Sequence, residues 1–308
     1  MNLPAAFILS EEVSRALNLG LPSVALESTV ITHGLPHPQN LQLAREMETT
    51  VRQNGAIPAT IALLDGTIRV GLDPSLLDRL GAESHPLKIS RRDFATAILK
   101  KECGGTTVAG TMFAAYRAGI RVFATGGIGG IHRESRFDIS TDLQALADTP
   151  MIVVCAGAKA ILDLPATLEY LETMAVPVIG YRTEEFPAFY SRESGLPVSA
   201  RLDSAQTIVE FAQTHWDLGF RSAVLVVNPV PITEAIPRSE IEPLIARASQ
   251  EAQAAGIHGQ AVTPFLLQRL TELTGGRSLQ ANLALLLNNA RLAAEIAVHW
   301  AKRTLNHA

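Results

Sequence analysis

The sequence predicts a single α/β domain over residues 1–308, with three α/β/α layers, a mixed but mostly parallel central sheet and a long C-terminal helix. Strand-like runs alternate with helical patterns, which is typical of parallel strands joined by crossover helices. An Asp65-Gly66 pair between two strand-like runs predicts one antiparallel hairpin. Residues 278–306 are apolar around much of a helical surface, so this last helix is expected to be buried.

The first clear helical pattern covers residues 41–54. Apolar or small side chains recur there at Leu41, Ala44, Met47 and Val51, and Gly55 is placed to end the helix. The predicted strands occupy residues 23–27, 60–64, 68–71, 121–125, 151–155, 176–181 and 222–227.

Two further helices are predicted by their first residues. Ser90 followed by Asp93 resembles a capping box that opens a helix through residue 100. Asp163 before Pro165 predicts a second helix, which extends through residue 174.

Composition excludes several classes of function. The formal net charge is -4 and charged residues make up 18% of the chain, which leaves no basic surplus for a nucleic-acid polymer or a membrane surface. Cys103 and Cys155 form no metal-spaced cluster, so a reduced, cytoplasmic setting is expected. The first residues carry no leading positive charge, and no apolar run approaches the ~18 residues that span a bilayer. We therefore expect a soluble protein without a signal peptide.

Lys159 is the first candidate for chemistry. It follows the strand-like run 151–155 by a few small residues and is flanked by Ala158 and Ala160. Desolvation at the mouth of a buried strand favours the neutral amine that a Schiff-base nucleophile requires. The alternative is an ordinary solvated lysine just past a strand end.

Glu27 is the second candidate, because it ends the predicted strand 23–27 at the edge where open α/β sheets bind ligands. Hydroxyl side chains and His33 follow closely. A general acid or base role fits this position, whereas the alternative is a carboxylate that caps a turn or pairs with an arginine.

The glycine-rich segment 125–132 lets backbone N–H groups approach a ligand, but it lacks both the dinucleotide and the Walker spacing. Such a segment is more often a tight turn than an anion-binding loop. Asp138 lies just before a predicted helix start at Ser140, Thr141 and Asp142. Free N–H groups there suit an anionic substrate, and the carboxylate suits a divalent cation. The same residue types are also ordinary helix caps.

Lys88 lies near Arg91 and Arg92, and the three form a cationic cluster. Such a cluster binds phosphate or forms surface ion pairs of little energetic weight.

Taken in order, eleven segments from about Val24 to about Ala297 resemble the pseudouridine-5'-phosphate glycosidase family. These segments are VALESTVITHGLP, GAIPATIALLDG, KISRRD, GGTTVAGTM, GGIGGIHR, FDISTDL, VVCAGAKAILD, TLEYLET, VPVIGY, EEFPAFYSR and NNARLAAEIA.

This resemblance implies reversible cleavage of the carbon–carbon glycosidic bond of pseudouridine 5'-phosphate to uracil and ribose 5-phosphate, in nucleotide catabolism. It implies Lys159 as the Schiff-base lysine, Glu27 as the proton donor and Asp138 as the ligand of one manganese ion, or another divalent cation, per subunit. It also implies a homotrimer. The positions that it places at the substrate are Lys88, Val108, His132, Ser140, Thr141, Asp142 and Asn289.

One segment departs from the family. Residues 133–137 read RESRF, which is shorter than the family's loop of the HRGAE type, and site residues flank it on both sides. Two other functions stay open on the residues themselves. A sugar-phosphate aldolase would share the lysine chemistry but release no uracil, and a regulatory nucleotide-binding protein would bind without turnover.

Overall fold

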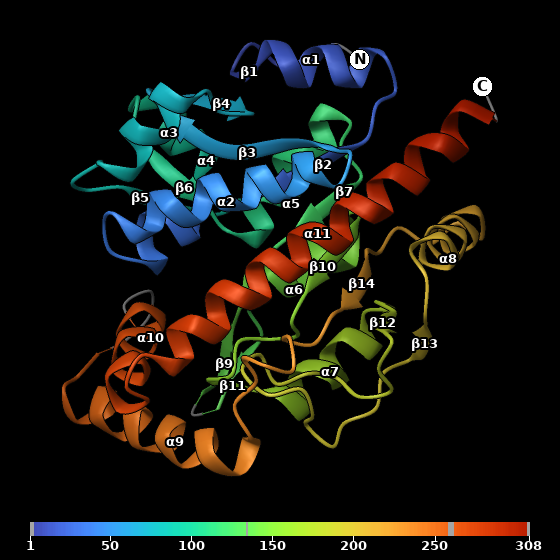
Figure 1. Cartoon of the computed structure of the whole chain (residues 1–308). Coiled ribbons are helices and arrows are strands. Elements are labelled where there is room, and N and C mark those ends of the chain that lie inside the picture. Colours follow the sequence, from blue (N-terminus) through green and yellow to red (C-terminus); the bar gives the residue numbers. More distant parts are fainter. Residues whose placement is uncertain (1–2, 134, 258–261, 307–308) are drawn as a thin grey trace.

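In the computed structural model, residues 3–133, 135–257 and 262–306 are described, and a mixed sheet forms the centre of the molecule (Figure 1). Its strands run in the order β1-β4-β3-β2-β7-β10-β14-β12-β13. All neighbours from β3 to β13 along this path are parallel. The bounds are β1 (Phe7–Leu9), β2 (Ser23–Leu26), β3 (Ile57–Leu64), β4 (Thr67–Val70), β7 (Val122–Ala124), β10 (Ile152–Cys155), β12 (Val178–Tyr181), β13 (Ala200–Leu202) and β14 (Val224–Val227).

Helices cover both faces of this sheet. On one face, α11 (Arg277–Asn306) crosses β2, β7 and β10 and also packs on α2 (Gln39–Gln53) and α8 (Ala205–Asp217). On the other face lie α5 (Val108–Ala118), α6 (Thr141–Asp148) and α7 (Leu164–Thr173). The central strands β2, β7, β10 and β14 are buried at every position, as expected for parallel strands that are covered on both sides. The predicted three-layer fold is confirmed.

The remaining elements extend this core. They are α1 (Glu11–Asn18), the π-helical turn η1 (Val30–Gly34), α3 (Pro74–Gly81), β5 (Leu87–Ile89), α4 (Phe94–Leu99), β6 (Gly104–Thr106), β8 (Ile131–His132), β9 (Ser135–Ile139), β11 (Leu162–Asp163), α9 (Arg238–Ala254) and α10 (Val262–Leu273). β8, β9 and β11 form a small separate antiparallel sheet. None of the described helices is long and apolar enough to cross a membrane.

Local signals located several elements correctly. Asp65 and Gly66 adopt φ values of 51° and 71°, and they join the antiparallel pair β3–β4 as the predicted hairpin. Asp163 caps α7 by accepting a hydrogen bond from the Ala166 N–H at 3.0 Å, with Pro165 in the first turn. The long C-terminal helix and the helix over residues 41–54 are also present, as α11 and α2.

Two predictions need correction. The helix expected to open at Ser90 begins only at Phe94, after a turn at residues 91–93. The Ser90 N–H does donate to the Asp93 carboxylate at 2.9 Å, as in a capping box, but this bond closes the turn and not the first turn of the helix. The segment 133–137 was interpreted as a loop, but β9 occupies most of it and pairs with β8. Glu134 of that segment lies outside the described residues. Strands as short as β8 and β9 have too few residues for a period-2 pattern to be visible in the sequence.

Candidate active site

The candidate catalytic residues meet because their strands are neighbours. Glu27 follows β2 and Lys159 follows β10, and β7 lies between these two parallel strands. The carboxyl ends of all three strands therefore reach the same edge of the sheet, where α/β proteins form their ligand crevices. Glu27 and Lys159 line the same cavities at this edge.

Glu27 is buried and held from one side. The Thr125 hydroxyl, at the end of β7, donates a hydrogen bond to Oε1 of Glu27. Burial raises the pKa of the Glu27 carboxyl above its ordinary value of 4.5, and the nearby Lys159 charge and the Thr125 hydrogen bond only partly oppose this rise. A buried carboxyl with a raised pKa is suited to the proton-donor role that the sequence predicted for Glu27.

The turn after Glu27 is fixed by Ser28, which is fully buried. Its hydroxyl donates to the Ile61 carbonyl at 2.5 Å and accepts from the Thr106 N–H at 2.9 Å. These bonds join the end of β2 to β3 and β6. Ser28, one of the hydroxyl residues that follow Glu27 in the sequence, therefore has a structural role.

Lys159 is half-buried and reaches the cavity through a sharp turn. Gly157 adopts φ +88°, and a Cβ on it would lie 2.2 Å from the Pro187 carbonyl oxygen, so only glycine fits there. The Lys159 N–H then donates to the Ile128 carbonyl at 3.1 Å, and the Lys159 carbonyl accepts from the Leu162 N–H at 3.0 Å. The backbone of Lys159 is consequently held on both sides.

Two adjoining cavities meet at Glu27 and Lys159. The larger, called the polar cavity below, has a volume of about 330 Å³ and is lined mostly by polar residues. The smaller measures about 60 Å³ and includes Val30, Phe189 and Leu286 in its wall. The residues that line both cavities are Glu27, Thr29, Lys88, Lys159 and Thr263. A ligand with a charged part and a flat, less polar part therefore fits across the junction.

The polar cavity receives most of the site residues that the sequence singled out. It is lined by Lys88, Val108, His132, Asp138, Ser140, Thr141 and Asp142. The first turns of α5 and α6 open into it, and their N–H groups favour an anion. Burial, and next the charge of Lys159, lower the pKa of the Lys88 ammonium. The charge of Lys159 therefore disfavours the charged form of Lys88.

Asp142 has a structural task in addition to its place in the cavity wall. It is 5% exposed, and its carboxylate accepts hydrogen bonds from the Ala109 N–H of α5 and from the Gly129 N–H, both at 2.9 Å. A Cβ on Gly129 would lie 2.2 Å from the Ser140 hydroxyl. The glycine-rich segment is therefore a tight turn that is tied to the starts of two helices.

We expect Asp142→Ala to lower the free energy of unfolding by about 2–4 kcal/mol, because two buried N–H groups lose their acceptor. Asp73→Ala is the matched control, since that carboxylate also caps a helix, through the Leu76 N–H at 2.9 Å, but lies away from the cavities. This control should lose only about 1 kcal/mol. Urea unfolding of both variants measures the difference, and equal losses would contradict the assignment.

Asn289 is placed differently from the other predicted residues. It is 0% exposed and lines neither cavity. Its Nδ2 donates to the Thr125 carbonyl at 2.8 Å, and its Oδ1 accepts from Asn228 at 3.1 Å. Asn289 thus holds the end of β7, next to the Thr125 hydroxyl that contacts Glu27.

Two residues at the site were not found from the sequence. Thr125 contacts Glu27 but lines neither cavity, and it ends a predicted strand, so the strand-end rule that selected Glu27 could have found it. Thr263 lines both cavities but carried no such signal, because it comes from α10, distant in the chain. His33, noted after Glu27 in the sequence, lines the smaller cavity. Within the cationic cluster, Arg92 lines the polar cavity, whereas Arg91 pairs with Asp148 at 2.8 Å.

Asp138 is the candidate metal ligand, and its exposed carboxylate faces the polar cavity. Among the described residues, no group of three or more His, Cys, Asp or Glu side chains could hold a metal ion. Hard divalent cations in phosphate sites often use one or two carboxylates and complete their shell with water and phosphate oxygens. Asp138 fits an ion of this kind, with one carboxylate supplied by the described part of the chain.

The fold and the site define an α/β enzyme with an amine and a buried carboxyl side chain at the edge of a parallel sheet. The family model described as "Indigoidine synthase A like protein" matches residues 12–299. The chain is 58% identical to the pseudouridine-5'-phosphate glycosidase of Methylobacterium nodulans, over 93% of this chain and 86% of the relative. It is 54% identical to the protein of that name from Caldanaerobacter subterraneus, over 96% of both chains.

A solved structure agrees over nearly the whole chain. The prealnumycin C-glycosynthase in complex with ribulose 5-phosphate superposes with a TM-score of 0.91 at 40% identity, covering 98% of this chain and 99% of that one. The chain belongs to the pseudouridine-5'-phosphate glycosidase family, a family of enzymes.

Proposed function

We propose that this enzyme cleaves the carbon–carbon glycosidic bond of pseudouridine 5'-phosphate reversibly, with water, to give uracil and ribose 5-phosphate in nucleotide catabolism. The observation that carries the proposal is the meeting of Glu27 and Lys159 where the two cavities adjoin. Curated relatives that carry this enzyme name are 54% and 58% identical to the chain. A solved relative is called a C-glycosynthase and holds a five-carbon sugar phosphate, which supports the same bond type and ligand class.

The chemistry explains why an amine and an acid are needed together. In an ordinary glycoside, a general acid can protonate the oxygen or nitrogen atom that leaves. Here the leaving atom is C5 of uracil, and a carbanion at C5 is a very poor leaving group. Glu27 instead protonates the ribose ring oxygen as the C1'–O bond breaks, with electrons supplied by the uracil ring. C1' then becomes open to addition.

Lys159 is proposed to add to C1' as a neutral amine. The ammonium formed by this addition returns its proton to the Glu27 carboxylate, and Glu27 then protonates C5. The C1'–C5 bond breaks while the nitrogen lone pair forms an iminium with C1', and uracil leaves. Water hydrolyses the iminium to free the amine and ribose 5-phosphate, and the proton that the water releases restores the Glu27 carboxyl, so no oxidant is needed.

Each of the two cavities suits a different part of the substrate. The polar cavity, with Lys88 and the starts of α5 and α6, suits the ribose phosphate. The smaller cavity, with Phe189 and Asn282 in its wall, suits a flat base that also forms hydrogen bonds. Binding both parts would place C1' at the junction, beside Glu27 and Lys159.

A direct assay tests the function. Purified protein is mixed with pseudouridine 5'-phosphate, and uracil is followed by its absorbance and by chromatography. Release of equal amounts of uracil and ribose 5-phosphate is expected. Conversion of the sugar phosphate without uracil would favour the aldolase, and binding without turnover would favour a regulatory protein.

We further propose that a divalent cation, manganese in the first instance, assists by neutralising phosphate charge, with Asp138 as its protein ligand. Chelator treatment should lower the rate of uracil release, and added manganese should restore it. Asp138→Asn should require a higher manganese concentration for half-maximal rate, by roughly tenfold or more. Manganese binding by the free protein, followed by electron paramagnetic resonance, should weaken in parallel. Unchanged metal titration in Asp138→Asn would remove Asp138 from this role.

The resemblance also predicts a cytoplasmic homotrimer, which we retain as a proposal. Sedimentation velocity of the purified chain tests the assembly, and a monomer at micromolar concentration would contradict it.

A further inference from the structure

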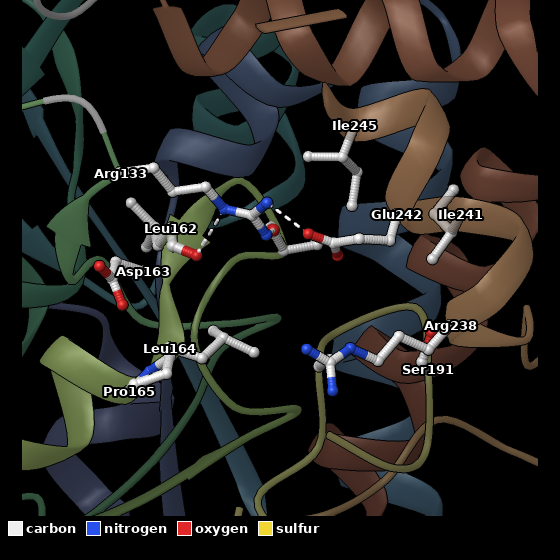
Figure 2. Close-up of a pocket in the computed structure, with 12 residues that line it drawn as sticks. Arg133, Leu162, Asp163, Leu164, Pro165, Ser191, Arg238, Ile241, Glu242 and Ile245 are labelled. Carbon is white, nitrogen blue, oxygen red and sulfur yellow. Dashed lines mark hydrogen bonds and ion pairs between the residues drawn. The ribbon is translucent and has the colours of Figure 1, made fainter. Parts of the chain in front are cut away.

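Arg133 lies outside the two cavities at the candidate active site but contacts the turn that carries Lys159 (Figure 2). Its Nη2 donates to the Ala160 carbonyl at 2.9 Å, and its Nε donates to the Leu162 carbonyl at 3.1 Å. These are the first and third residues after Lys159. One rigid guanidinium therefore fixes two carbonyls of a single turn.

The third nitrogen of the guanidinium connects this turn to α9. Nη1 of Arg133 forms an ion pair with Glu242, and the two side chains are only 32% and 38% exposed. Figure 2 shows Arg133 extending across to Glu242 beside a cavity of about 310 Å³. All three sides of the fork thus have acceptors, two on the Lys159 turn and one on the helix.

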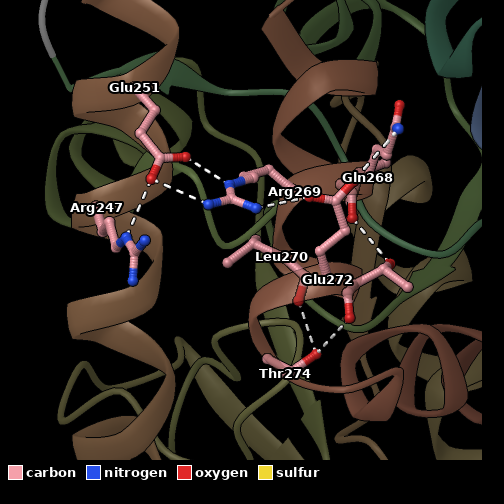
Figure 3. Close-up of polar contacts among 9 residues, drawn as sticks. Arg247, Glu251, Gln268, Arg269, Leu270, Glu272 and Thr274 are labelled. Carbon is pink, nitrogen blue, oxygen red and sulfur yellow. Dashed lines mark hydrogen bonds and ion pairs between the residues drawn. The ribbon is translucent and has the colours of Figure 1, made fainter.

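Helix α9 in turn supports α10, which forms part of the cavity wall. Arg269 of α10 binds Glu251 of α9 and Glu272 of its own helix (Figure 3). Thr263 at the start of α10 lines both cavities. One ion pair therefore links the turn after Lys159 to α9, and a second links α9 to α10, which contributes Thr263 to the walls of both cavities.

We propose that Arg133 is a positioning residue for the reaction, which holds the Lys159 turn in register with α9. This inference rests on the proposed function, because it concerns the approach of the Lys159 amine to C1'. The backbone upstream of Lys159 is fixed by the bond of its N–H to Ile128, but downstream the turn depends on Arg133 as well as on its own N–H to carbonyl bond. A displacement of about 1 Å at a reacting atom can cost about 100-fold in rate.

Arg133→Gln should lower kcat by about 10- to 100-fold while KM changes less than threefold, since the residue touches no substrate. Trapping of ribose 5-phosphate on the protein with borohydride should slow in the same proportion. Arg133→Lys keeps the charge but cannot form the planar fork, so it should restore little activity. Full rescue by lysine would overturn the proposal.

Glu242→Gln is the second variant, because it leaves both carbonyl contacts in place and removes only the anchor on α9. A loss in kcat of roughly fivefold is expected, which corresponds to the upper end of the free energy that a partly exposed ion pair contributes. Glu240→Gln is its matched control: Glu240 lies two residues away on α9 and pairs with Arg277, not with the Lys159 turn. Equal rates for the Glu242 and Glu240 variants would overturn the proposal even if Arg133→Gln fails to fold.

The proposed function has a separate readout in this experiment. Wild-type protein that traps no sugar phosphate and releases no uracil refutes the function itself. Wild-type protein that does both, together with Arg133→Gln that does both at the same rate, refutes only the role of Arg133.

Discussion

Lys159→Ala is expected to lose at least about 10⁴-fold in the rate of uracil release, because the variant lacks the electron pair that drives cleavage. The substitution removes a half-buried side chain that lines both cavities, and the backbone of this residue is held by bonds that do not involve the amine. Folding should therefore be retained. Borohydride reduction with ribose 5-phosphate should add one reduced sugar phosphate to the wild type and none to the variant.

Lys88 is the rival nucleophile that this experiment must separate. It lines the same cavities, and burial lowers the pKa of its ammonium, which favours the reactive neutral form. Peptide mapping of the reduced adduct distinguishes the two amines. Lys100→Ala, an exposed lysine away from the site, serves as the matched control and should trap normally. An adduct on Lys88 would transfer the nucleophilic role to that residue.

Glu27→Gln should lower the rate of uracil release by about 10²- to 10⁴-fold, because glutamine has the shape of the protonated carboxyl but supplies no acidic proton. Glu48→Gln provides a close control. Glu48 is half-buried, its pKa is raised by burial, and Thr60 donates a hydrogen bond to it at 2.6 Å. It lines neither cavity, so its substitution should leave activity near that of the wild type. Similar losses in both variants would show that any buried glutamate has this effect.

The raised pKa of Glu27 also sets the direction of two pH dependences. As an acid, Glu27 must be protonated, so kcat/KM should fall as the pH rises through its raised pKa. For stability, the folded state binds this proton more tightly than the unfolded state, whose carboxyl titrates near 4.5. This tighter proton binding therefore increases the free energy of unfolding at pH values below 4.5, and the increase is lost as the pH rises to the folded pKa. Glu27→Gln should remove this decline, and Glu48→Gln should remove the similar contribution of Glu48.

Much of the fold was readable from local patterns, since those patterns act over a few residues. The Asp65-Gly66 turn, the Asp163 cap and the apolar face of α11 each depend on neighbours in the chain. The same holds for the placement of Glu27 and Lys159 at strand ends, because parallel strands in one sheet end at a common edge. The small sheet β8-β9-β11 was missed, since β8 and β11 have only two residues each and pair with one another across a long stretch of sequence.

The sequence by itself determined the α/β class and both candidate catalytic side chains, because alternation, turn chemistry and strand ends are local properties. Only the tertiary structure decided that Asn289 donates a hydrogen bond to the Thr125 carbonyl and that the Asp142 carboxylate caps the start of α5. It also decided that the guanidinium of Arg133 joins the Lys159 turn to α9. Each of these contacts pairs buried or half-buried polar groups from separate elements. Such pairs are selected by the requirement that polar groups removed from water find partners, and no pattern within a single segment specifies which partner is found.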